Sequence, residues 1–467
     1  MRVVADAAPV FFAPPRRSRL ARLGDAVRKH RRLILGIQWT IVAAYLVLVT
    51  LPAFAPLPPS GASIVSNLTL FAQFAFWGIW WPFVMLSMML VGRVWCGVLC
   101  PEGALSEWAS RHGLGRSIPR WMRWSGWPFV AFVSTTAYGQ LVSVYEYPKA
   151  ALLVLGGSTA AAGVIGFVYG KGKRVWCRHL CPANGVFALL AKVAPLHFRA
   201  DEQAWKRYSG RAAAVDCAPL VDLRHLQSAS HCHACGRCSG HRGAMELALR
   251  SPNREILSGA PARDGAAAAL LLVFGVLGVA TGAFHWTVSP WFVAMKVAAA
   301  GWLIEHDWLW LAKDNAPWWI LTHYPEASDV FTWLDGLCIV AYMAGTAIVL
   351  GGTAFIALRG AQFLAGRGRY DWKSLAMALI PVAGICVFLG LSMVTITHLR
   401  AEGAAFAWLG GARAALLALG LAWSGWLGTR LILASPAPLA RRSAALALYA
   451  LPLGLIGYIW ALAFYVW

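Results

Sequence analysis

Two nine-residue stretches decide the fold: Arg93-Val94-Trp95-Cys96-Gly97-Val98-Leu99-Cys100-Pro101 and Arg174-Val175-Trp176-Cys177-Arg178-His179-Leu180-Cys181-Pro182. Seven of their nine positions are identical, at an offset of 81 residues. Each stretch directly follows a long apolar run. The repeat therefore predicts two membrane spans that end in the same Cys-x3-Cys-Pro sequence, which we call the cap.

The proline that closes each cap predicts the start of a helix along the membrane surface. Proline is favoured in the first turn of a helix, where its missing N–H is not needed. Pro101 and Pro182 would then place Cys100 and Cys181 at helix N-termini. The positive end of the helix dipole stabilises thiolates and an anionic cluster there.

The composition places most of the chain in lipid. The 467 residues are 59% hydrophobic and only 13% charged, whereas soluble domains are about 25% charged. There are 41 Lys and Arg against 20 Asp and Glu, a net charge of +21. The basic residues fall mainly in short loops between apolar runs, so they indicate orientation in a bilayer, and no nucleic-acid partner is expected.

Nine apolar runs are long enough to span a bilayer, which takes about 20 residues. They lie at 33–54, 69–92, 126–144, 150–170, 265–288, 330–358, 374–397, 405–430 and 443–466. The N-terminal tail and alternate loops are basic, so the positive-inside rule makes them cytoplasmic. We predict an all-α integral membrane protein of about nine transmembrane helices in the bacterial cytoplasmic (inner) membrane.

The chain divides into four regions on this basis. A basic cytoplasmic tail (1–32) precedes a four-helix membrane region with both caps (33–195). A small polar segment (196–263) follows, and we predict a cytoplasmic ferredoxin-like iron–sulfur insert there. The C-terminal membrane region (264–467) includes a Trp- and His-rich stretch at 289–329, predicted to lie on the periplasmic side.

A third thiol group lies in the polar segment. Cys232, Cys235 and Cys238 match the start of the bacterial ferredoxin motif C-x2-C-x2-C-x3-C-P. The fourth ligand would be expected at position 242, which is Arg242. Cys217 is a spare thiol fifteen residues upstream of Cys232.

Eight clustered thiols suffice for two [4Fe-4S] clusters with four cysteine ligands each. Our preferred partition assigns Cys96, Cys100, Cys177 and Cys181 to one cluster and Cys217, Cys232, Cys235 and Cys238 to the other. A crossed partition, with a cap cysteine completing the 232–238 group, stays open. Structural zinc is the alternative metal, although it usually uses two separated C-x2-C pairs. A cytoplasmic location disfavours disulfides.

In these residues the chain resembles the NapH/NosR-type membrane polyferredoxins and the related cytochrome-oxidase accessory iron–sulfur proteins. The resemblance covers roughly residues 70–250 and rests on the doubled cap followed by a ferredoxin-type motif. It implies cytoplasmic clusters and electron transfer. The chain departs from the family because its ferredoxin motif is incomplete. The large flavin-bearing domain of the NosR branch is also missing, so FMN is not expected.

The predicted function is that of a membrane-bound iron–sulfur electron-transfer protein. It would pass electrons between a quinone pool or cytoplasmic donor and a partner redox protein, as a component rather than a stand-alone enzyme. A quinone or quinol ligand is left open. The alternative is a metal-handling or assembly factor for a metalloenzyme, with the 289–329 stretch as its metal or client site.

Four histidines are further candidates. His285 and His398 end two spans near the outer face, where bis-His haem would need such a pair on facing helices. Interfacial histidines explain them better, so haem is not expected. His306 and His323 are candidates for binding a metal or a quinol headgroup, with interfacial polar residues as the simpler interpretation.

Overall fold

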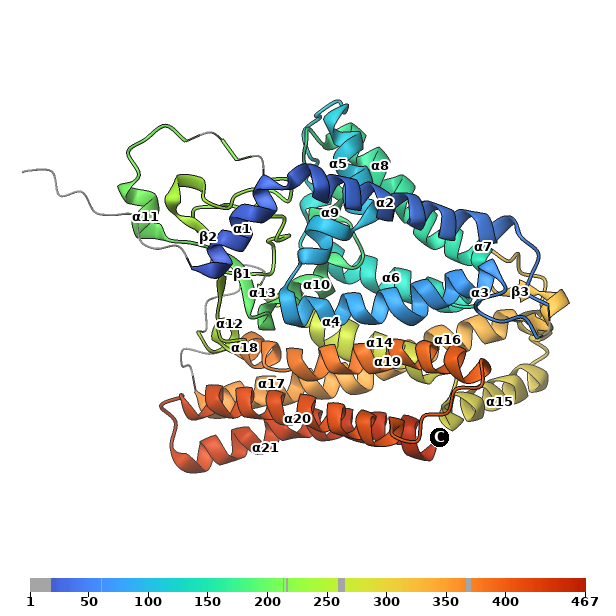
Figure 1. The fold of residues 1–467 in the computed structure, drawn as a ribbon. Helices are drawn as coiled ribbons and strands as arrows, with labels where there is room; N and C mark the ends of the chain where they lie inside the picture. The colour runs from blue at the N-terminus through green and yellow to red at the C-terminus, as the bar shows by residue number, and fades with distance from the viewer. Residues whose placement is uncertain (1–17, 60, 213, 216, 259–264, 367–370) are drawn as a thin grey trace, which may run out of the picture.

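The computed structural model describes residues 18–59, 61–212, 214–215, 217–258, 265–366 and 371–467. Residues 1–17 of the predicted tail and 259–264 of the predicted insert lie outside the described residues. The long helices run roughly parallel to one another (Figure 1). A small unit with α1, β1, β2 and α11 projects from one end, whereas α15 and β3 lie at the opposite end (Figure 1). We call the former end the cap end, because both caps lie there.

Among the described residues, eight helical segments are long and apolar enough to cross a membrane. The first three are Arg31–Phe54 (α2 Arg31–Thr50, η1 Leu51–Phe54), Leu68–Val91 (α3 Leu68–Gln73, η2 Phe74–Trp80, α4 Trp81–Val91) and Pro148–Tyr169 (α7 Pro148–Ala151, η5 Leu152–Gly156, α8 Gly157–Tyr169). The next two are Gly265–His285 (α13 Gly265–Leu270, η8 Leu271–Val279, α14 Ala280–His285) and Trp333–Ala365 (α16 Trp333–Thr346, η11 Ala347–Gly351, α17 Gly352–Ala365). The last three are Trp372–Ala401 (α18 Trp372–Met377, α19 Ile380–Ala401), Leu409–Leu433 (α20) and Leu439–Val466 (α21 Leu439–Ala461, η12 Leu462–Val466). The chain is therefore a mainly helical, multi-pass membrane protein.

The predicted span 126–144 is not among these eight segments. It corresponds to α6 (Trp127–Leu141), which is only 15 residues long. Its start packs on the second cap region, where Pro128 faces Gly185. Its last residue, Leu141, accepts a hydrogen bond at the opposite end from the backbone N–H of Thr322. Thus α6 connects the two ends of the bundle. The count of nine membrane crossings stays a prediction.

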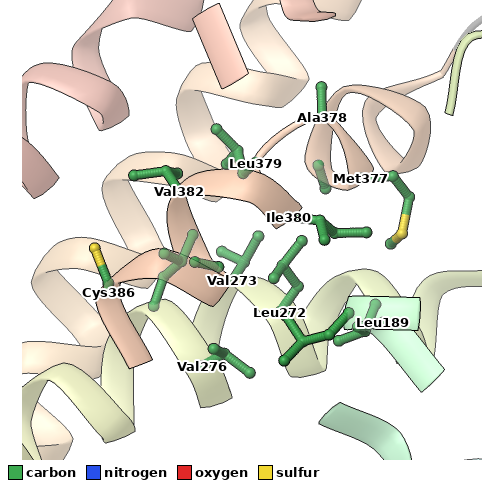
Figure 2. Packing of buried hydrophobic residues seen from close by; sticks show 14 of the residues in the cluster. Leu189, Leu272, Val273, Val276, Met377, Ala378, Leu379, Ile380, Val382 and Cys386 are labelled. Atoms are coloured by element: carbon green, nitrogen blue, oxygen red, sulfur yellow. The ribbon is translucent and has the colours of Figure 1, made fainter. Parts of the chain in front are cut away.

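The apolar core lies where η8 meets the α18–α19 segment. Leu272, Val273 and Val276 pack against Ile380 and Val382, and all are at most 3% exposed (Figure 2). Near 25 cal/mol per Å² of buried apolar surface, such side chains contribute about 1.5–3 kcal/mol each in a soluble protein. Between transmembrane helices, close packing takes over that role, because lipid is as apolar as the side chains.

The insert begins with strand β1 (Leu196–Ala200), which pairs antiparallel with β2 (Met245–Leu249). Around this pair lie α11 (Glu202–Arg207), η7 (His241–Gly243) and α12 (Arg254–Leu257). Glu255 of α12 anchors the insert, since it accepts hydrogen bonds from Arg250 and Ser228, both at 2.6 Å. Arg250 also donates to the backbone carbonyls of Ala191, Lys192 and Ala194 at the end of the first membrane region.

The remaining elements lie at the two ends of the bundle. At the cap end they are α1 (Arg19–Lys29), η3 (Trp95–Leu99), α5 (Pro101–Arg111), η4 (Trp121–Arg123), α9 (Val175–His179), α10 (Asn184–Leu190) and η6 (Ala191–Val193). At the opposite end they are α15 (Pro290–Glu305), η9 (Leu309–Ala312), β3 (His323–Tyr324), η10 (Pro325–Ala327) and β4 (Asp329–Val330), with β3 and β4 paired antiparallel.

Candidate metal centre

The first cap folds as the sequence predicts. After α4, Trp95–Leu99 forms one π-helical turn that carries Cys96. Cys100 is the N-cap of α5, and its Sγ accepts a hydrogen bond from the backbone N–H of Gly103 at 3.4 Å. The predicted helix start at Pro101 is confirmed, and Cys100 lies at the positive end of that helix.

The second cap differs from the first after its last cysteine. The prediction that a helix starts at Pro182 is wrong: Pro182 and Ala183 form a turn, and α10 starts at Asn184. Cys181 is therefore not an N-cap residue. The Asn184 side chain accepts a hydrogen bond from Arg93 at 2.7 Å and donates one to the carbonyl of Arg178 at 3.3 Å. These bonds tie the start of α10 to both caps.

The first arginine of each cap reaches into the other cap. Arg93 and Arg174 are 2% and 1% exposed. Arg93 bonds Asn184, which follows the second cap, and its guanidinium also lies 3.8 Å from Cys96 Sγ. Arg174 of the second cap donates to the backbone carbonyl of Cys96 in the first. Hydrogen bonds from both arginines thus join the two copies of the repeat.

The four cap thiols lie within electrostatic range of one another. Burial raises the pKa of Cys100, and neighbouring Cys177 and Cys96 raise it further. Burial likewise raises the pKa of Cys177 to about 12. Burial also raises the pKa of Cys181, and Glu102, Cys177, Cys100 and Cys96 add to it. Burial thus favours the protonated form of Cys100, Cys177 and Cys181, and a bound metal centre would supply the positive charge that deprotonates them.

The other four thiols line one cavity in the insert. Cys217, Cys232, Cys235 and Cys238 line this cavity together with mainly apolar side chains, among them Phe198, Val215, Val221, Leu223 and Leu226. The backbone N–H of Ala234 donates to Cys232 Sγ at 3.4 Å. Burial raises the pKa of Cys232 to about 12, despite that hydrogen bond. The spare thiol Cys217 therefore lies beside the three motif cysteines.

Arg242 occupies the position where a ferredoxin motif has its fourth cysteine. It has a left-handed backbone conformation (φ 53°). Its guanidinium carbon lies 5.0 Å from the ring centre of Trp205, a cation–π distance. Arg242 is thus held on the surface of α11 and is not among the residues that line the cysteine cavity.

The insert packs directly on the first cap at Gly97. A Cβ atom on Gly97 would lie 1.9 Å from the carbonyl oxygen of His233 and 2.9 Å from the backbone nitrogen of Cys235. Only glycine fits this position. The equivalent residue of the second cap is Arg178. One of the two differences between the caps therefore has a physical cause, because the insert loop 232–238, which we call the cysteine loop, leaves no room for a side chain at Gly97.

A buried carboxylate joins the caps to the insert. Glu107 of α5 accepts hydrogen bonds from Arg174 at 2.9 Å, from Arg237 at 2.6 Å and from Arg111 at 2.8 Å. Burial alone would raise the pKa of Glu107, but the nearby Arg174 and Arg237 lower it to about 2. Arg237 lies between two of the insert cysteines, so this ion pair fixes their loop against the caps.

Helix α1 also packs on the cysteine loop of the insert. The sequence predicts only a polar tail here, yet Asp25 accepts a hydrogen bond from Ser239 at 2.8 Å. Val27 packs on Gly236, where a Cβ atom would meet its side chain at 2.6 Å. The signal in the sequence was Ser18, which caps α1, followed by the small or apolar residues Leu20, Ala21, Leu23, Gly24 and Val27 along the helix.

The four candidate histidines lie apart from the thiols. His285 is buried, bonds the carbonyl of Thr281 and packs edge-on against Trp460 at 4.7 Å. His398 bonds the carbonyl of Val394. His306 stacks on Trp302 with ring centres 4.1 Å apart, and His323 lies in β3. The contacts of His285, His398 and His306 with Thr281, Val394 and Trp302 are therefore local ones within a helix.

All ten cysteines lie within the described residues and are free thiols. Cys338 and Cys386 are buried in the apolar interior. In the part of the chain that the structure describes, no three His, Cys, Asp or Glu side chains converge as ligands of a single ion do. A cubane asks for a different arrangement, because each cysteine binds a separate iron corner. Two groups of four thiols at one end of the bundle supply the number of ligands that two such clusters need, and Cys96, Cys177 and Cys238 among them are buried.

Comparison with known families also indicates iron–sulfur binding. Residues 73–121 and 153–200 each match the 4Fe-4S binding domain. Each match encloses one cap, so the repeat seen in the sequence is a repeat of an iron–sulfur binding unit. The insert cysteines lie outside both matches. No curated protein and no solved structure matches the chain.

Proposed function

We propose that the protein is a membrane-bound electron carrier with two [4Fe-4S] clusters. Cys96, Cys100, Cys177 and Cys181 would hold one cluster, and Cys217, Cys232, Cys235 and Cys238 would hold the other. When bound, each cluster supplies one-electron chemistry, accepting and releasing an electron without a proton. The observation that carries the proposal is that the two sets of four cysteines lie on segments in direct contact. Gly97 of the first cap packs on the backbone of the insert at Cys235.

The surrounding residues suit an anionic cofactor. A cubane with four thiolate ligands carries net negative charge, and hydrogen bonds to its sulfurs and nearby charges tune its potential. Arg93 and Arg174 place two buried guanidinium groups between the caps, with Arg93 directed at Cys96 Sγ. Arg237 adds a third guanidinium beside the insert thiols. These cations favour the deprotonated, cluster-binding form of the cysteines.

The tight contacts also serve electron transfer between the two groups. The Glu107 ion pairs, the glycine contact and α1 hold the insert loop in one position on the caps. A fixed position means that little reorganisation accompanies each transfer. We place the cap end in the cytoplasm, by the positive-inside rule, and expect a quinone pool or a cytoplasmic donor at one end of the route and a partner redox protein at the other.

The assembly-factor alternative has less support. It would use the 289–329 stretch as a metal or client site. There, His306 is engaged by Trp302, and Lys296 pairs with Asp335. These contacts give His306 and Lys296 structural partners, and the electron carrier is the function that we propose.

Cysteine variants test the proposal and the partition together. Cys96→Ser and Cys177→Ser should each remove the same EPR signal and about four irons per chain, by the stoichiometry of a cubane. Cys217→Ser should remove the other signal, with Cys386→Ser as the control that removes neither. Different signals lost in Cys96→Ser and Cys177→Ser would establish the crossed partition instead. Retention of all iron in all three cluster variants would contradict the proposal.

A further inference from the structure

A groove lined by basic side chains lies between the N-terminal helices and the insert. It has a volume of about 920 Å³. Its charged lining residues are cations from both walls: Arg28, Arg31, Arg211, Arg237 and Arg242. None of the residues described as lining it is acidic. We call this hollow the basic groove.

Two guanidinium nitrogens of the groove residues have unused hydrogen-bonding capacity. Nη1 of Arg237 and Nε of Arg242 are both buried and have no hydrogen-bond partner among the described residues. Arg237 uses only its other terminal nitrogen, Nη2, on Glu107. Buried donors without partners are rare and costly in proteins. An anion in the groove would offset the repulsion between the arginines and would give the guanidinium groups a counter-charge.

The groove continues onto an apolar surface of the first span. Arg28, Arg31 and Arg237 also line a second, smaller hollow, whose other walls include Ile34 and Leu35. Arg31 is the first residue of the first membrane-spanning segment. Ile34 and Leu35 lie one turn further along α2, on the membrane side. The lining therefore changes from cationic to apolar in the direction in which a bilayer changes from headgroup to acyl chain.

We propose that the basic groove binds the headgroup of an anionic phospholipid. The phosphodiester would lie among Arg28, Arg31 and Arg237, with the start of an acyl chain along Ile34 and Leu35. Basic pockets at the ends of transmembrane helices bind anionic lipid headgroups in this way. A soluble phosphate compound would have no use for the apolar wall. The lipid would bridge α1, α2 and the insert beside Cys235, which lines the smaller hollow.

Native mass spectrometry of the full-length protein tests this binding. The protein is extracted from vesicles of phosphatidylcholine with a minority of phosphatidylglycerol, and the retained lipid is identified. Wild type should retain phosphatidylglycerol, and Arg28→Gln with Arg31→Gln should weaken its binding roughly 25-fold, about fivefold for each arginine near the surface. The matched control is Lys29→Gln with Arg32→Gln, which removes the same charge at the same depth from exposed residues outside the groove lining and should retain the lipid.

Two further arms keep the result decisive. Arg242→Gln removes a cation from the opposite wall without touching α1 or α2, and it should also weaken retention. Glycerol 3-phosphate and inorganic phosphate, added in excess, should not displace the lipid. Equal loss in the Arg28/Arg31 and Lys29/Arg32 variants would show general surface attraction and overturn the proposal. Displacement by glycerol 3-phosphate would overturn it in favour of a soluble phosphate ligand. Since the readout is bound lipid, it does not depend on cluster content.

Discussion

Replacing Glu107 with glutamine should weaken the attachment of the insert to the caps. The Glu107 side chain is 5% exposed, and that of its partner Arg174 is 2% exposed, so neither can turn to water. Arg237 is nearly as buried, whereas Arg111 is 44% exposed and contributes little. The variant would leave two buried guanidinium groups without a counter-charge.

The expected loss follows from the pKa of Glu107. Arg174 and Arg237 overcome the effect of burial and lower this pKa from an ordinary value of 4.5 to about 2. That difference corresponds to roughly 3 kcal/mol of interaction with the charged form. Removing one partner of a buried ion pair typically costs 3–5 kcal/mol. We therefore expect Glu107→Gln to lower the free energy of unfolding of the insert by about 3 kcal/mol.

Urea denaturation of the purified full-length protein, monitored by proteolytic cleavage within the insert, measures this loss. The matched control is Glu246→Gln, because Glu246 pairs with Arg199 at the surface, where the side chains are 31% and 46% exposed. An exposed pair contributes only about 0–1 kcal/mol. Equal destabilisation by the two substitutions would show that the buried ion pairs of Glu107 stabilise the insert no more than an exposed pair does.

The same pKa sets the pH dependence of this contact. The folded pKa of Glu107 lies below its unfolded value, so the stabilisation is fully present above about pH 4.5 and is lost as the pH falls toward 2. The difference between wild type and Glu107→Gln should therefore stay constant between about pH 5 and pH 8. A difference that disappears within that window would assign the stabilisation to another group.

The remaining predictions concern packing and orientation. Gly97→Ala places a Cβ atom 1.9 Å from a carbonyl oxygen of the insert. The loop must therefore move by at least about 1.1 Å to restore a distance of 3.0 Å between these two atoms. Such overpacking typically costs about 1–3 kcal/mol. The EPR interaction between the two clusters should weaken in Gly97→Ala but not in Gly36→Ala, where an added Cβ meets nothing; an unchanged interaction would count against the packing of the insert on the cap. Cysteines introduced at Ser66 and Ser328 should react with an impermeant maleimide in intact cells, whereas one at Ser251 should not; the reverse pattern would invert the proposed topology.

The spans and the first cap were predictable because their signals are local. Apolar runs and the Cys-Pro sequence act through hydration and helix capping, which depend on neighbouring residues. The position of Cys217 was predicted by counting thiols rather than from any local signal. The turn at Pro182 was not predicted, because the hydrogen bond from Arg93 to Asn184 joins residues 91 positions apart.

The contacts that join the insert to the caps could not be predicted from the sequence, because they also join residues that are far apart in the chain. Nothing near Glu107 in the sequence indicates its role, because its partners Arg174 and Arg237 lie 67 and 130 residues away in the chain. Helix α1 carries several apolar residues among many charges, so its composition indicated a solvated tail. The apolar side of α1 packs on β2, more than 200 residues away in the sequence, where Gly24 lies against Leu247.

We propose that eight thiols at one end of the bundle hold two redox-active [4Fe-4S] clusters. The most direct test is to purify the full-length protein without oxygen and to measure iron, acid-labile sulfide and zinc together with a reductive EPR titration. We expect about eight irons and eight sulfides per chain, little zinc, and two reversible one-electron signals that interact with each other. Stoichiometric zinc without sulfide, or a single cluster whose signal survives loss of Cys217, would contradict it.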